Sequence, residues 1–84
     1  MERMWIRGVN RLKAAEMLFS SKEGFSVDTY RKYDELEIVV QDDGRYSVWG
    51  NFRDDSDLLQ DTRRDPENCV RKLLVLADKI STEE

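Results

Sequence analysis

Few residues in this sequence could carry out covalent or acid–base chemistry. The 84 residues include no histidine and a single cysteine, Cys69. Histidine-based triads and Cys/His zinc sites are therefore excluded. Cys69 falls on the apolar side of a predicted helix, so we expect a structural thiol rather than a nucleophile. None of the four glycines belongs to a phosphate-binding loop. We therefore expect no enzymatic activity, no catalytic residue and no cofactor.

Carboxylates are the most distinctive reactive groups. Four aspartates fall within eight residues, namely Asp54, Asp55, Asp57 and Asp61. Oxygen ligands suit calcium, but this segment lacks the central glycine and terminal glutamate of an EF-hand loop, so we expect no metal site. A negative patch that binds a basic surface is one interpretation, extended by Asp42 and Asp43 if the chain folds back across one end of the sheet. An acidic loop that serves only solubility is the other.

Charge is divided unevenly along the chain, whose net charge is −4. Residues 1–22 carry five basic and two acidic side chains, whereas residues 34–67 carry eleven acidic and four basic ones. The acidic half disfavours nucleic acid and anionic membranes, and it favours a partner protein with a basic surface. A basic face on the N-terminal helix is the alternative, because it could contact phosphates. That face comprises Arg3, Arg7, Arg11 and Lys13.

Two helices are predicted from hydrophobic periodicity. Residues 2–21 fit an amphipathic helix that ends near Gly24. Its apolar stripe comprises Met1, Met4, Trp5, Gly8, Val9, Leu12, Ala15 and Phe19. A final helix is predicted from Asp65 to Ile80, where Asp65 is a good N-cap and Pro66 suits the first helical position.

Strands are predicted in the middle of the chain. Residues 36–41 and 45–52 are rich in β-branched and aromatic side chains. Residues 25–33 alternate more weakly and predict a first strand that is exposed on one side. Residues 53–65 are expected to form an acidic connection with one helical turn after Ser56.

The register of the predicted hairpin follows from the parity of its faces. A two-residue turn would place Ile38 opposite Trp49. A three-residue loop, with Gly44 in a left-handed conformation, places Ile38 opposite Val48 and aligns two apolar faces. The second register leaves Trp49 and Val39 on the other face of the sheet, where we expect both to be accessible to a partner.

These elements predict one α+β domain that spans residues 1–84, because the chain is too short for two cores. The expected architecture is a small two-layer sandwich in the order helix, two or three antiparallel strands, helix. Each helix has one apolar stripe, so both helices are expected on the same face of the sheet.

The favoured function is a small, acidic, non-enzymatic regulatory domain that binds another protein. It would be an inhibitor that competes for a basic nucleic-acid-binding surface, as phage-encoded anti-restriction and anti-CRISPR proteins do. The candidate partner-binding residues are Trp49, Val39, Asp54, Asp55, Asp57, Asp61, Leu58 and Leu59. A nucleic-acid-associated regulator that uses the basic face, and a small structural or assembly subunit, are the alternatives.

The expected compartment is the cytoplasm, with the protein as a monomer or a homodimer. A single cysteine fits a reducing environment. No apolar run approaches the about 18 residues of a membrane span, and the first residues lack the apolar stretch of a secretory signal.

Overall fold

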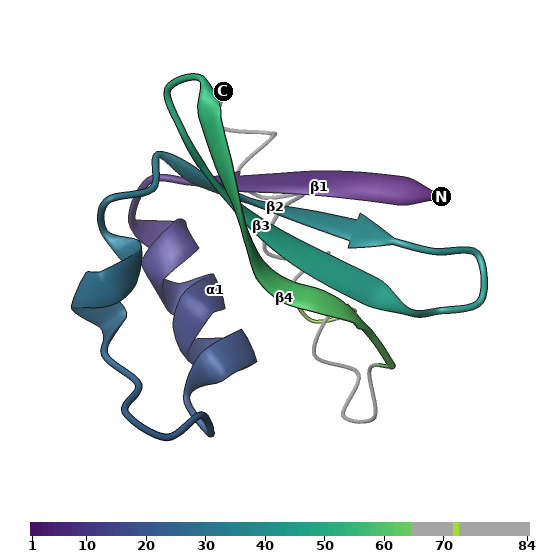
Figure 1. Cartoon of the computed structure of the whole chain (residues 1–84), viewed down its shortest axis with the longest axis horizontal. Coiled ribbons are helices and arrows are strands. Elements are labelled where there is room, and N and C mark those ends of the chain that lie inside the picture. Colours follow the sequence, from purple (N-terminus) through teal and green to yellow (C-terminus); the bar gives the residue numbers. More distant parts are fainter. Residues whose placement is uncertain (65–71, 73–84) are drawn as a thin grey trace.

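A four-stranded antiparallel sheet with one α-helix against one face makes up the described part of the chain (Figure 1). This computed structural model describes residues 1–64 and 72. The strands lie side by side in chain order: β1 (Glu2–Arg7), β2 (Glu35–Val40), β3 (Tyr46–Phe52) and β4 (Asp55–Arg63). The helices are α1 (Val9–Phe19) and the 3-10 helix η1 (Val27–Tyr30).

The predicted order of helix, strands and helix, with both helices on one face of the sheet, is therefore wrong. The described residues contain one α-helix and four strands, because β1 and β4 occupy segments that were not expected to be extended. The predicted final helix, from Asp65 to Ile80, lies outside the described residues.

β1 replaces the first part of the predicted N-terminal helix. Met4 and Ile6 are buried and alternate with exposed residues such as Trp5 and Arg7, which is the two-residue period of a strand. The predicted helical stripe includes Met4 and Trp5 but not Ile6, whereas pairing with the apolar strand β2 buries Ile6 together with Met4. Gly8 then separates β1 from α1, with φ 61° and ψ −153°, a conformation that is essentially restricted to glycine.

The strand predicted for residues 25–33 is also wrong, because this segment packs through aromatic rings instead. Tyr30, in η1, stacks on Phe19 of α1 with ring centroids 5.1 Å apart and nearly parallel planes. Phe25 contacts Tyr30 at a centroid distance of 5.9 Å. Offset ring stacking of this kind adds to simple burial, so it outweighs a weak alternation of residue types.

The hairpin of β2 and β3 confirms the predicted register. Val40 pairs with Tyr46 and Ile38 with Val48, and Gly44 has φ 88° in the three-residue loop. The inner face of this hairpin, together with α1 and η1, forms the hydrophobic core. The core comprises Met4, Ile6, Ala14, Ala15, Phe19, Tyr30, Tyr33, Leu36, Ile38, Tyr46 and Val48.

β4 occupies the segment that was predicted as an acidic connection. It pairs with β3 from Phe52 opposite Asp55 to Tyr46 opposite Arg63. The register shifts twice along this pair, and β4 bends along its length (Figure 1). Most of its residues are exposed. Charges and bulges on an edge strand discourage pairing with other chains, so the aspartates of β4 also have a structural role.

Candidate protein-binding site

The four clustered aspartates are distributed along the β3–β4 hairpin. Asp54 lies in the turn, and Asp55 and Asp57 lie opposite Phe52 and Gly50, on the same side of β4. Asp61 follows near the other end of the strand. The predicted single patch is divided, because the β2–β3 turn with Asp42 and Asp43 and the β3–β4 turn with Asp54 lie at opposite ends of β3. Asp61 lies toward the β2–β3 turn, next to Thr62, which lines a pocket together with Asp42 and Asp43.

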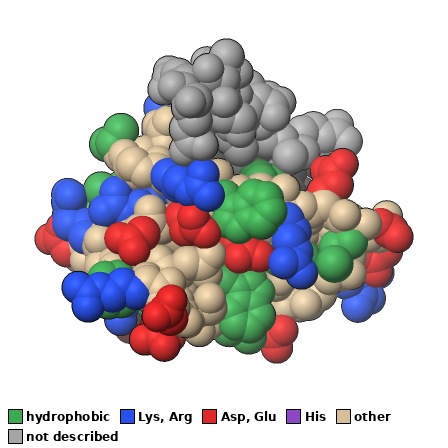
Figure 2. All heavy atoms as spheres, turned by 90° about the horizontal axis from the view of Figure 1, so that it is seen from above, with side chains coloured by type: hydrophobic (Ala, Val, Ile, Leu, Met, Phe, Trp, Pro, Cys, Tyr) green, Lys and Arg blue, Asp and Glu red, His purple; other side chains and the backbone are tan. Residues whose placement is uncertain are grey.

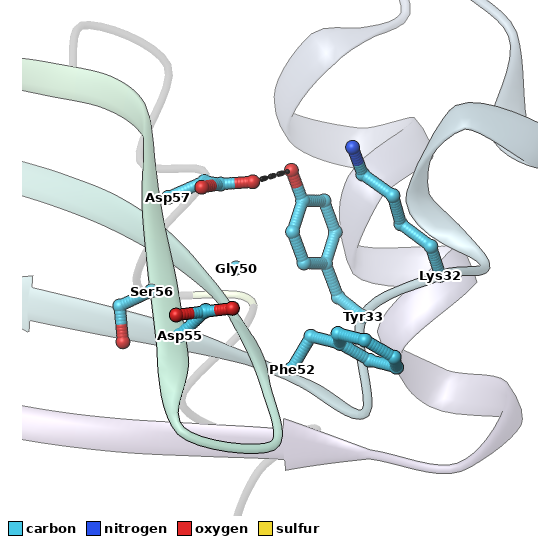
Figure 3. A pocket seen from close by; sticks show the side chains of 7 residues that line it. All are labelled: Lys32, Tyr33, Gly50, Phe52, Asp55, Ser56 and Asp57. Carbon is cyan, nitrogen blue, oxygen red and sulfur yellow. Dashed lines mark hydrogen bonds between the residues drawn. The ribbon is translucent and has the colours of Figure 1, made fainter.

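Asp55 and Asp57 line a pocket between β4, the end of β3 and the segment after η1 (Figure 3). Its lining residues are Lys32, Tyr33, Gly50, Phe52, Asp55, Ser56 and Asp57. The pocket has a volume of about 220 Å³. Small-molecule and cofactor sites typically occupy about 300 to 1,000 Å³, so this pocket is better suited to a single side chain.

Tyr33 forms the wall of the pocket and is 5% exposed. Its ring lies so close to Gly50 that a Cβ atom at position 50 would come within 2.7 Å of ring carbons. The Tyr33 hydroxyl donates a hydrogen bond of 2.7 Å to Oδ2 of Asp57 (Figure 3). Burial, followed by this hydrogen bond and the charge of Asp57, raises the pKa of Tyr33 to about 12. The phenol is therefore a neutral donor at ordinary pH.

Arg11 of α1 holds the segment that carries Tyr33. Its Nε donates to the carbonyl of Tyr33 at 2.7 Å, and its Nη2 donates to the carbonyl of Arg31 at 3.1 Å. On the other side, the amide of Asp34 donates to the carbonyl of Asn51 at 2.8 Å. The position of the Tyr33 ring is thus fixed from both the helix and β3.

Basic side chains already lie over both aromatic rings of the pocket. Nζ of Lys32 is 5.1 Å from the ring centroid of Tyr33, and the guanidinium of Arg53 is 5.1 Å from that of Phe52. Such distances are within the range of cation–π attraction. The carboxylate of Asp55 forms no hydrogen bond or ion pair with another residue of the described ranges, and it is exposed. Both rings therefore already have a cation of this chain beside them. Phe52, which is 39% exposed, is the ring with accessible surface, and Asp55 supplies an available carboxylate.

The predicted basic helix face is not assembled. Its four members are divided between β1, which carries Arg3 and Arg7, and α1, which carries Arg11 and Lys13. Arg7 donates to Glu35 at 2.9 Å, and Arg3 contacts Glu37 at 3.4 Å. The face shown in Figure 2 likewise mixes acidic and basic side chains with separate hydrophobic groups. Phosphate binding by a continuous basic surface is not supported by this arrangement.

The four apolar candidates lie in different environments. Trp49 and Leu58 are cross-strand partners on the face away from α1, with Leu58 46% exposed and Trp49 half-buried. Val39 is only 7% exposed, so the expectation that it is accessible is wrong. Leu59 is partly buried and packs against the core.

Sequence reasoning missed Tyr33 and Phe52 as parts of this site. Tyr33 was assigned to a strand that does not exist. Because Tyr33 and Gly50 are far apart in sequence, no local pattern indicates that they are in contact. The one available signal was Gly50 itself, because a glycine inside an apolar strand often marks a close approach by another part of the chain.

Comparisons with known protein families, with curated proteins and with solved structures found no match for this chain. Within residues 1–64 and 72, no three carboxylate or thiol side chains gather closely enough to hold a metal ion. No helix in the same described part is both long and apolar enough to cross a membrane.

Proposed function

We propose that this protein is a small non-enzymatic domain that binds another protein through the acidic β3–β4 hairpin. The partner presents a basic surface, and this domain competes with nucleic acid for that surface. The observation that carries the proposal is the grouping of Asp55 and Asp57, on the edge strand β4 of the described sheet, beside the exposed ring of Phe52 at the end of β3.

Charge and shape support this proposal in different ways. The carboxylates of the hairpin raise the rate of encounter with a basic surface at low salt. An aromatic side chain such as Phe52, which is 39% exposed, supplies the apolar contact that charges alone do not give.

The test uses a fluorescently labelled arginine- and glycine-rich peptide as a basic probe, measured by anisotropy at low and moderate salt. One variant changes all four hairpin aspartates to asparagine. Its control, Glu2→Gln, Glu16→Gln, Glu23→Gln and Asp43→Asn, removes the same charge at exposed positions elsewhere. We expect the first variant to lose at least about tenfold in affinity and the control to lose about twofold or less.

Two results would overturn the proposal. Equal losses in the two variants would show that net charge alone attracts the peptide. Binding of the unmodified protein to duplex DNA in place of the peptide, with affinity falling steeply as salt rises, would favour a nucleic-acid-associated regulator instead.

A further inference from the structure

We infer that the pocket formed by Tyr33, Phe52, Asp55 and Asp57 accepts the guanidinium group of an arginine from the partner. This inference rests on the proposed function, and it adds the chemical group that the site recognises. It makes the β3–β4 hairpin a receptor for one particular side chain rather than a general acidic surface.

Charge balance inside the pocket favours a single cationic guest. Two carboxylates, Asp55 and Asp57, face one ammonium group, that of Lys32, so the lining carries one net negative charge. The guanidinium of Arg53 lies over the ring of Phe52 but is not part of the lining. Asp57 uses Oδ2 to accept from Tyr33. An ionised carboxylate has about four acceptor positions, so Asp57 can accept further hydrogen bonds. One guanidinium would neutralise the lining and satisfy these acceptors.

The arrangement of the side chains favours arginine over lysine. In Figure 3, the carboxylate of Asp55 and the rings of Tyr33 and Phe52 border the same space from different elements. A planar guanidinium can stack on the exposed ring of Phe52 and donate to the carboxylate of Asp55 at the same time, whereas the ring of Tyr33 is nearly covered. The ammonium of lysine is a more strongly hydrated point charge without a flat face, so it gains less in such a site.

Two other pockets in the described part of the chain do not share these features. The first, of about 430 Å³, is lined by Asp42 and Asp43, which already pair with the N-terminal amine and with Arg45. The second, of about 270 Å³, includes Glu35, which is paired with Arg7 and bonded to Asn51. Neither pocket is lined by an aromatic ring.

The experiment compares three labelled peptides that differ at one central residue, which is arginine, lysine or the uncharged isostere citrulline. The unmodified protein should bind the arginine peptide about fivefold or more tightly than the lysine peptide. The citrulline peptide should bind about tenfold or more weakly than the arginine peptide. Equal affinity for arginine and lysine, or for arginine and citrulline, would overturn the inference.

Variants locate the binding site. Asp55→Asn and Phe52→Leu should each lower the affinity for the arginine peptide by about tenfold. Asp54→Asn removes the same charge one residue away, from a side chain that does not line this pocket. It should lower the affinity for the arginine peptide by about twofold or less. Unchanged melting temperatures verify that all three variants fold.

The outcomes distinguish this inference from the proposed function. If Asp54→Asn and Asp55→Asn weaken binding equally while the fourfold aspartate variant still abolishes it, the specific pocket is wrong and the acidic hairpin stands. If the fourfold variant binds every peptide normally, both are wrong.

Discussion

The two hairpins that share β3 are built on different physical principles. The β2–β3 hairpin has a regular register, a glycine in its loop and an inner face that is almost fully buried. The β3–β4 hairpin has two register shifts, and Arg53 rather than glycine adopts a positive φ of 54° in its turn. Its second strand is exposed and acidic.

The difference shows that burial of one face fixes the register of a strand pair, whereas an exposed strand can carry side chains that serve in binding. A slip of one residue in β2 would turn Ile38 out of the core, so its pairing is strongly specified. β4 has few buried residues to lose. It therefore tolerates bulges and carboxylates that a buried strand would not accept.

The largest expected effect is the difference between the two hairpins in the stability lost on truncating an apolar side chain. Ile38→Ala, at a fully buried position, should cost about 2 to 5 kcal/mol of unfolding free energy because it leaves a cavity. Leu58→Ala, on the exposed side of β4, should cost about 0.5 kcal/mol or less. Urea unfolding measures both changes. Equal costs would show that β4 is as deeply integrated into the fold as β2.

A second effect tests the contact between Tyr33 and the middle of β3. Gly50→Ala places a methyl group 2.7 Å from ring carbons, so it should cost about 1 to 3 kcal/mol through overpacking. The same substitution made in a Tyr33→Ala background should be nearly neutral, because the opposing ring is gone. A cost that is the same in both backgrounds would contradict the close approach.

The two turns should respond differently to changes at their positive-φ residues. Gly44→Ala should cost about 1 kcal/mol, because a Cβ atom is disfavoured at φ 88°. Arg53→Gly removes similar strain, but glycine loses more conformational entropy on folding, so the net change should be within about 0.5 kcal/mol. Denaturant midpoints with unchanged slopes would verify both values. A large loss of stability in Arg53→Gly would indicate that the contact of Arg53 with Phe52 stabilises the turn.

The smallest effect is a pH dependence that arises in the pocket. The pKa of Tyr33 is raised from 10.0 to about 12 in the folded protein, so the unfolded chain ionises first as the pH rises. The stability that this shift contributes is present below about pH 10 and is lost towards about pH 12. The stability difference between the native protein and Tyr33→Phe should therefore shrink from about pH 8 to about pH 11. A constant difference would contradict the raised pKa.

The sequence predicted the β2–β3 hairpin, including its loop length and its buried face, because only the three-residue loop aligns the apolar faces of both strands. It also located α1 approximately, although the helix begins at Val9 rather than near Glu2. The alternation of Met4 and Ile6 was missed because Met1, Met4 and Trp5 fit a helical stripe, which leaves out Ile6. The candidate site was anticipated only through its carboxylates.

Composition, charge and apolar patterning thus determined which residues could form a core and which acids were available for binding. Only the tertiary structure decided that residues 2–7 and 55–63 are strands, because a short or polar segment becomes extended when a neighbouring strand satisfies its backbone hydrogen bonds. The same is true of the pocket. Tyr33 reaches Asp57 across 24 residues because Gly50 leaves space for its ring, and no local pattern in the sequence encodes that contact.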